Sequence, residues 1–185
     1  MDLRVEKTKQ NIQAAFLDLR RRKPLEKITV KELCQGARIH KSTFYAHYED
    51  LYALSDALET EVVERVIFGL PRPEDVLEHP GRFTRELFRS YAAQEETIQV
   101  LFSGSRSGRL VEKLEEGLKQ LVFRQRPQYA QDEAMHIFLS YSVYGAYFAY
   151  TRNRDCDPHS AVELLGRLSQ AAKELVLPSE NNRNE

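Results

Sequence analysis

Apolar residues recur at intervals of three and four positions along most of the chain, which is the spacing of an amphipathic helix. In the first such stretch, residues 6–22, the spacing is carried by Ile12, Ala15, Phe16 and Leu19. No stretch of the sequence shows the alternation of period two that marks a half-buried strand. The pattern therefore predicts an all-α protein of about nine helices.

Proline, glycine and short polar segments separate the periodic stretches and set the predicted boundaries. The predicted helices cover residues 6–22, 30–35, a short stretch from 41, 51–68, 74–79, 82–103, 109–124, 130–151 and 161–176. Pro71 and Pro73 make the clearest break in the chain. We expect an N-terminal domain in residues 1–50, a C-terminal domain in residues 51–178, and a polar, disordered tail in residues 179–185.

The stretch that begins at residue 28 carries the most informative local pattern. Thr29 and Glu32 have the spacing of a capping box, in which each side chain accepts a hydrogen bond from the backbone amide of the other residue. Gly36 is predicted to end this helix, because glycine adopts the left-handed conformation of a helix C-terminus without a steric penalty.

A second short helix is predicted to begin near Lys41 or Ser42. Phe44 and Tyr48 lie one turn apart and form its buried side. The open side consists of Ser42, Tyr45 and Ala46, flanked by Thr43 and His47.

Two short helices joined by a tight turn that contains glycine form the arrangement that inserts a second helix into the major groove of DNA. Lys41 and Ser42, at the start of the second helix, would reach base edges, and the side chains after them would donate to phosphates. The spacing alone fits two helices of an unrelated all-α protein equally well. The predicted DNA contacts are Lys27, Thr29, Lys41, Ser42, Thr43, Tyr45 and His47.

The same stretch resembles the N-terminal signature of the TetR/AcrR family of transcriptional regulators. The matching residues are Thr29-Val30-x-x-Leu33-Cys34-x-x-Ala37-x-Ile39-x-Lys41-Ser42-Thr43-Phe44-Tyr45-x-His47-Tyr48-x-Asp50-x-Tyr52-x-Leu54. The resemblance implies an all-helical homodimer whose N-terminal module binds a palindromic operator and whose C-terminal part dimerises and usually holds an inducer pocket. One position departs from the family: Leu51, after Glu49 and Asp50, stands where a lysine commonly contacts a phosphate.

Charge is distributed unevenly along a chain whose formal net charge is −1. Residues 1–48 carry 11 Lys and Arg against 5 Asp and Glu, a net charge of +6, and the remaining residues carry a net charge of −7. A basic segment in an otherwise acidic chain predicts a local nucleic-acid footprint. Within that segment, the basic run from Arg20 to Lys23 has two possible roles. It either approaches DNA phosphates or complements the dipole at the C-terminus of the predicted helix of residues 6–22, and we favour the second role.

The last two predicted helices carry more apolar surface than a monomer of 185 residues hides easily. A glycine at position 145, within a predicted helix, lowers the stability of that helix by about 1 kcal/mol relative to alanine. The close approach of another backbone, which the missing side chain allows, would explain why glycine stands there. Its position resembles the glycine of the dimer-forming penultimate helix in one TetR C-terminal subclass. We expect a two-fold four-helix interface, with a buried intrachain core as the alternative. The predicted interface residues are Phe138, Tyr141, Gly145, Leu164, Leu165 and Leu168.

Aromatic side chains on the inner faces of the C-terminal helices either line an apolar ligand pocket or simply fill the core. The pocket candidates are Tyr91, Phe102, Phe123, Tyr144 and Phe148. Such a pocket would take a small apolar or aromatic inducer. Some members of the TetR C-terminal subclass that this part of the chain resembles bind protein partners instead of small molecules.

Other chemistry is weakly represented in the sequence. Cys34 and Cys156 give neither a disulfide framework nor a metal spacing, and Glu133 with His136 matches only half of a di-iron bundle motif. No arrangement of Ser, His, Asp or Cys indicates nucleophilic catalysis, so we expect no enzyme activity, no metal and no cofactor. No apolar run reaches the roughly 18–20 residues of a membrane span, and the N-terminus lacks the apolar core of a signal peptide. We therefore expect a cytoplasmic protein without membrane contact.

These features predict a homodimeric transcriptional regulator, a repressor that leaves a palindromic operator when a ligand shifts its conformational population. The alternative is a partner-binding adaptor of the same fold that acts through protein contacts of its C-terminal domain. Leu51 and the acidic pair Glu49 and Asp50 keep that alternative open.

Overall fold

The structure, a computed structural model, describes residues 3–176. Every regular element in that range is helical, with ten α-helices and three short 3-10 helices, so the predicted all-α class is confirmed. The predicted disordered tail, residues 179–185, lies outside the described residues. Between residues 3 and 176, none of the helices combines the length and the apolar character that crossing a membrane requires.

The chain divides into two compact units, each assembled from two separate segments. The first unit runs to Val62 and takes in Glu95–Leu110, whereas the second consists of Val63–Gln94 and the chain from Val111 onward. The first unit is therefore larger than the predicted domain of residues 1–50. It gains the first part of helix α4 and a segment that lies far away in the sequence.

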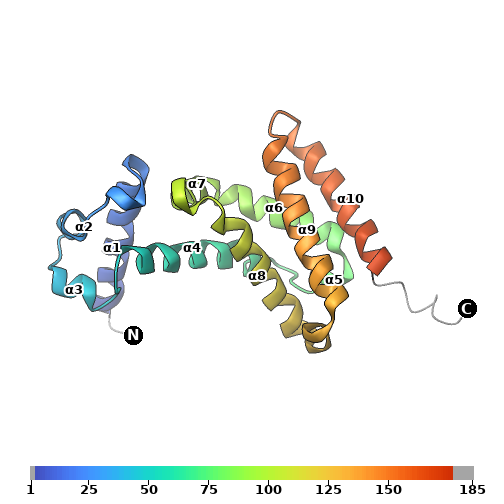
Figure 1. The fold of residues 1–185 in the computed structure, drawn as a ribbon, viewed down its shortest axis with the longest axis horizontal. Coiled ribbons are helices and arrows are strands. Elements are labelled where there is room, and N and C mark those ends of the chain that lie inside the picture. Colours follow the sequence, from blue (N-terminus) through green and yellow to red (C-terminus); the bar gives the residue numbers. More distant parts are fainter. Residues whose placement is uncertain (1–2, 177–185) are drawn as a thin grey trace, which may run out of the picture. The chain divides into compact units, whose positions relative to one another are not determined.

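The first unit is built around the N-terminal helices (Figure 1). Its elements are α1 (Leu3–Arg22), η1 (Leu25–Lys27), α2 (Val30–Ala37), α3 (Lys41–Tyr45), the first part of α4 (Leu51–Phe68), α7 (Glu95–Leu101), η2 (Gly104–Arg106) and the start of α8 (Arg109–Gln125). Helix α1 packs against both α2 and α7. The core follows the apolar spacing of the sequence, because Ile12, Phe16, Leu33, Phe44 and Leu54 are fully buried.

Gly36 does not end helix α2 as predicted. The helix continues to Ala37, and Arg38 adopts the left-handed conformation, with a φ of 56°. A Cβ atom built on Gly36 would lie 3.3 Å from the Cβ atom of Ala15 in α1. The glycine therefore serves the close packing of α1 and α2, and an arginine takes the position that glycine usually occupies at a helix C-terminus.

The predicted helix over residues 82–103 is wrong, because the structure contains two helices there. Helix α6 (Pro80–Ala93) belongs to the second unit and α7 to the first, and Gln94 interrupts them with a φ of −108° and a ψ of 4°. Apolar residues on the two sides of Gln94 continue one helical period in the sequence. They nevertheless pack into two different cores, which sequence periodicity does not distinguish.

The second unit contains the end of α4, α5 (Asp75–Glu78), α6, most of α8, η3 (Pro127–Gln131), α9 (Glu133–Arg152) and α10 (Pro158–Val176). Helix α10 packs against both α6 and α9, and Figure 1 shows α9 and α10 side by side. Gly81 of α6 and Gly166 of α10 face each other where these two helices pack together. A Cβ atom on Gly81 would lie 2.8 Å from the carbonyl oxygen of Gly166, so this crossing requires glycine.

Candidate nucleic-acid interface

Thr29 and Glu32 form the predicted capping box at the start of α2. The Glu32 amide donates to the Thr29 hydroxyl at 3.2 Å, and the Thr29 amide donates to the Glu32 carboxylate at 3.0 Å. Lys23 adds an ion pair to Glu32 at 2.6 Å. The Lys23 and Thr29 hydrogen bonds lower the pKa of Glu32 to about 2. The start of α2 is thus tied to the segment that follows α1.

Helix α3 presents the surface that its spacing predicts. Phe44 is fully buried and Tyr48 is 9% exposed, which confirms the predicted inner side. The opposite side is accessible: Lys41, Ser42, Tyr45 and Ala46 are exposed, and Thr43 and His47 are half-buried. This surface offers ammonium, hydroxyl, phenol and imidazole groups, all of which can donate hydrogen bonds to phosphates or base edges.

The first unit also carries exposed cations on α3 and on the segment before it. Among residues 3–176, no ion pair involves Lys27, Lys31, Arg38 or Lys41, and all four side chains are exposed. Thr29, the remaining predicted contact, is exposed beside them. Because no described residue forms an ion pair with these charges, they are available to a polyanion.

The basic run from Arg20 to Lys23 is used differently. Arg21 pairs with Glu96 at 3.0 Å, Arg22 pairs with Asp18, and Lys23 pairs with Glu32. Arg20 is buried. All four side chains of the run therefore make contacts within the first unit. These contacts are consistent with our preference for a structural role of the run over contact with phosphates.

The residues after the second helix also have defined roles. Asp50 acts as the N-cap of α4, because its carboxylate accepts a hydrogen bond from the Ala53 amide at 2.7 Å. Leu51 is only 8% exposed and belongs to the core. Members of the TetR/AcrR family, which this stretch resembles, commonly have a lysine at this position. In this protein the leucine at the position points into the core.

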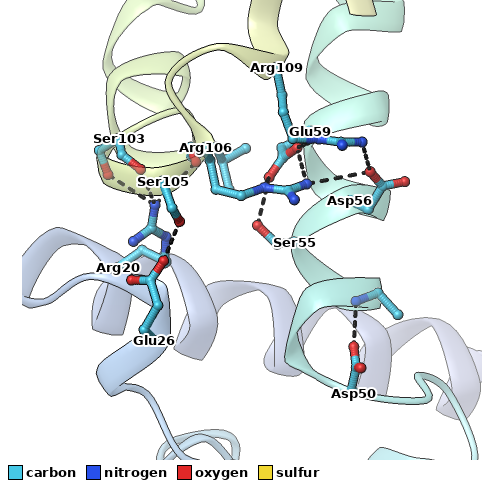
Figure 2. A network of polar contacts seen from close by, with 12 residues as sticks. Arg20, Glu26, Asp50, Ser55, Asp56, Glu59, Ser103, Ser105, Arg106 and Arg109 are labelled. Atoms are coloured by element: carbon cyan, nitrogen blue, oxygen red, sulfur yellow. Dashed lines mark hydrogen bonds and ion pairs between the residues drawn. The ribbon is translucent and has the colours of Figure 1, made fainter.

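A network of polar groups, with Arg20, Ser55 and Glu59 buried, joins the N-terminal helices to the segment from residue 101 to 109 (Figure 2). The guanidinium of Arg20 donates to the carbonyl oxygen of Leu101 at 3.1 Å and to the hydroxyl of Ser103 at 2.9 Å. Burial lowers the pKa of Arg20. These contacts tie the end of α1 to the loop that follows α7.

The second half of the network centres on Glu59 of α4, whose side chain is fully buried (Figure 2). Arg106 donates to its carboxylate through Nε at 2.7 Å and Nη2 at 2.6 Å, and the Ser55 hydroxyl donates at 2.7 Å. The Glu59 carboxylate raises the pKa of Arg106. At the edge of the network, Arg109 pairs with Asp56 at 3.0 Å.

This network was not predicted from the sequence, although the sequence contains a signal for it. Positions 51, 55, 59, 63 and 67 follow one another by four residues and are all buried. Polar residues at 55 and 59 thus interrupt an otherwise apolar stripe, which indicates a buried polar contact. The partner, Arg106, lies in a polar loop and has no such signal.

The predicted dimer residues lie along α9 and α10, where a groove of about 730 Å³ runs over the surface of the second unit. Phe138 and Leu165 are buried within the unit, whereas Tyr141, Leu164 and Leu168 are exposed. Apart from its chain neighbours and the adjoining backbone of α9, no atom of the described residues lies within 4 Å of a Cβ atom built on Gly145. Intrachain packing therefore does not explain this glycine.

The five predicted pocket residues do not come together around one cavity. Tyr91 lines an apolar cavity of the second unit, but Phe102 belongs to the first unit. The ring of Phe123 contacts that of His136, and Tyr144 and Phe148 contact each other. The spacing of these aromatic residues predicts that they lie on the inner faces of helices. It does not predict which of them line the same cavity.

Comparisons of the chain with protein-family models, curated proteins and solved structures find no match.

Proposed function

We propose that this chain is a sequence-specific DNA-binding transcriptional regulator, a repressor that acts as a homodimer on a palindromic operator. The observation that carries the proposal is the exposed surface of α3 together with four exposed cations of the same unit that form no ion pair among residues 3–176. This surface follows a capped helix and a tight turn, which is the order of a helix-turn-helix motif. The resemblance of residues 29–54 to the TetR/AcrR family supports the same function.

The homodimer is supported by the apolar surface of the second unit. Ile137, Tyr141, Leu164, Leu168 and Leu175 are more than half exposed, and all of them lie on α9 and α10. A contiguous apolar surface of this kind is typical of a protein interface. A two-fold dimer also suits a palindrome, since each copy would meet one half-site.

One observation favours a second candidate, a partner-binding adaptor. Leu51 is buried and follows two exposed acidic residues, Glu49 and Asp50, so the end of the motif contributes no cation to a DNA backbone. In an adaptor, the apolar surface of α9 and α10 would hold a different protein.

The test is a gel-shift titration of the full-length protein against DNA from upstream of its own gene. We expect a discrete complex, and we expect Lys41→Ala combined with Tyr45→Ala to lose discrimination between this DNA and a scrambled duplex. Each specific base contact is worth about 1–3 kcal/mol. The salt dependence of binding is expected to become shallower, since a neutralised phosphate contact contributes a slope of about one.

Arg21→Ala is the matched control. It removes one positive charge from the same unit, but this charge is already paired with Glu96. If Arg21→Ala lowers discrimination as much as the α3 variant does, the assignment of α3 as the recognition helix is wrong. A folded dimer that shifts no DNA at low salt would favour the adaptor.

A further inference from the structure

Arg38 has a backbone conformation that arginine rarely adopts. Its φ of 56° and ψ of 47° lie in the left-handed region, and among residues 3–176 it is the only residue other than glycine with a positive φ. A Cβ atom makes this conformation unfavourable, so glycine, or less often asparagine, usually stands at such a position. The chain therefore keeps an arginine where glycine would make the fold more stable.

Contacts within the chain do not explain this arginine. The backbone amide of Arg38 donates to the carbonyl oxygens of Cys34 and Gln35, and any residue except proline can form these bonds. The side chain is exposed and forms neither a hydrogen bond nor an ion pair with the described residues. A strained residue whose side chain has no role in its own fold points to a function outside that fold.

The position of Arg38 in the motif restricts what this function can be. The residue opens the turn between α2 and α3, three positions before Lys41. Three residues span at most about 11 Å. The major groove of DNA is about 12 Å wide, and phosphates follow its two rims. With α3 in the groove, a long side chain this close to the start of the helix reaches the phosphates of the rim.

The sequence after the start of α3 supplies no cation for such a contact. Neither lysine nor arginine occurs between Lys41 and Arg65, and the exposed residues Glu49 and Asp50 in this interval are acidic. Cationic contacts beside α3 therefore come from Lys41 or from residues before it. Arginine suits a phosphate better than lysine does, because its planar guanidinium can donate two parallel hydrogen bonds to one phosphate.

We propose that Arg38 binds a phosphate at the rim of the major groove and thereby fixes how α3 lies in the groove. The inference rests on the proposed DNA-binding function and adds to it a contact that the chain keeps although it lowers the stability of the fold. Phosphate contacts orient a protein on the duplex and carry no sequence information themselves. Arg38 therefore contributes affinity and salt dependence, whereas the side chains of α3 contribute discrimination between sequences.

The test compares Arg38→Gly with the wild-type full-length protein in two assays. In urea unfolding, Arg38→Gly is expected to raise the equilibrium constant for folding about two- to fivefold, because glycine adopts the left-handed conformation without a steric penalty. In the gel-shift titration, the same variant is expected to bind the upstream DNA about tenfold more weakly, which is the value of one charge-assisted hydrogen bond. The salt dependence is expected to become shallower by a slope of about one per bound copy, with discrimination against the scrambled duplex unchanged.

Two further variants of Arg38 separate its charge from its backbone conformation. Arg38→Lys keeps the charge and the strain, so it is expected to retain the salt dependence of the wild type. Arg38→Asn removes the charge and tolerates the left-handed conformation, so it is expected to bind DNA as Arg38→Gly does. Arg22→Gln is the matched charge control, since Arg22 is exposed in the same unit but pairs with Asp18. This control is expected to bind DNA as the wild type does.

The proposal is overturned if Arg38→Gly loses discrimination together with affinity, or if Arg22→Gln makes the salt dependence equally shallow. It is also overturned if Arg38→Gly does not stabilise the fold, since the arginine is then not strained. If the wild type forms a discrete complex and Arg38→Gly binds with the same affinity and slope, this inference fails and the regulatory function stands. If the wild type shifts no DNA, the regulatory function fails and the role of Arg38 fails with it.

Discussion

At the scale of single residues, the charged carboxylate of Glu32 stabilises the start of α2, the first helix of the candidate DNA-binding pair, and this contribution depends on pH. Its pKa falls from the ordinary value of 4.5 to about 2 because Lys23 and Thr29 hold the carboxylate in its charged form. A carboxyl group whose pKa is lower in the folded state stabilises the fold above its unfolded pKa, and this stabilisation is lost as the pH falls. The window for Glu32 therefore runs from about pH 4.5 down to about pH 2.

We expect Glu32→Gln to unfold with a shallower dependence on pH in this window, because glutamine keeps the capping geometry but does not titrate. The measurement is the urea midpoint at several pH values between 2 and 5. Glu116→Gln is the control, since it alters an exposed carboxylate that forms no ion pair among the described residues. Equal slopes for the two variants would contradict the role given to Glu32.

At the scale of secondary-structure elements, the contact of Glu59 with Arg106 holds the loop before α8 against α4. Because the Glu59 side chain is fully buried, Arg106→Met would leave a buried charge without its partner, which costs about 3–5 kcal/mol. Glu59→Leu in the same chain removes that charge and is expected to recover most of the loss. Chemical unfolding of both single variants and the double variant measures the coupling energy.

Arg21→Met provides the comparison, since Arg21 pairs with Glu96 while both side chains are more than 40% exposed. An exposed pair contributes about 1 kcal/mol or less. If Arg106→Met destabilises the protein no more than Arg21→Met does, the buried pair does not hold the loop.

The same elements show how far the sequence determines the structure. The capping box and the two faces of α3 were predictable because their contacts lie within one or two helical turns. The roles of Gly36 and Gln94 were not, because each depends on which helix packs opposite. The pairing of Glu59 with Arg106 spans 47 positions, and the apolar cavity of the second unit depends on six helices at once. Spacing along one helix carries no information about such distant partners.

At the scale of the whole molecule, the apolar cavity of the second unit and the groove of α9 and α10 have lining residues in common, which are Phe138, Ser142, Ala146 and Ser169. A second copy seated in the groove would therefore contact side chains that also line the cavity.

A substitution at Gly145 is expected to change the stability of the monomer and the stability of the dimer in opposite directions. Apart from the adjoining backbone of α9, a Cβ atom at this position meets no atom of the described residues within 4 Å, and alanine is about 1 kcal/mol more favourable than glycine inside a helix. Gly145→Ala is therefore expected to stabilise the monomer. The added methyl group would keep a second backbone at a greater distance, so the dimer dissociation constant is expected to rise.

Unfolding at a dilution at which the protein is monomeric measures the first effect, and sedimentation at higher concentration measures the second. Gly117→Ala is the matched control within another helix, because its Cβ atom would lie 2.6 Å from Cδ1 of Ile67. This control is expected to destabilise the monomer. If Gly145→Ala stabilises the monomer and leaves dimerisation unchanged, the two copies do not meet at this glycine. The apolar surface of α9 and α10 would then have a different partner, which is the outcome that the adaptor function requires.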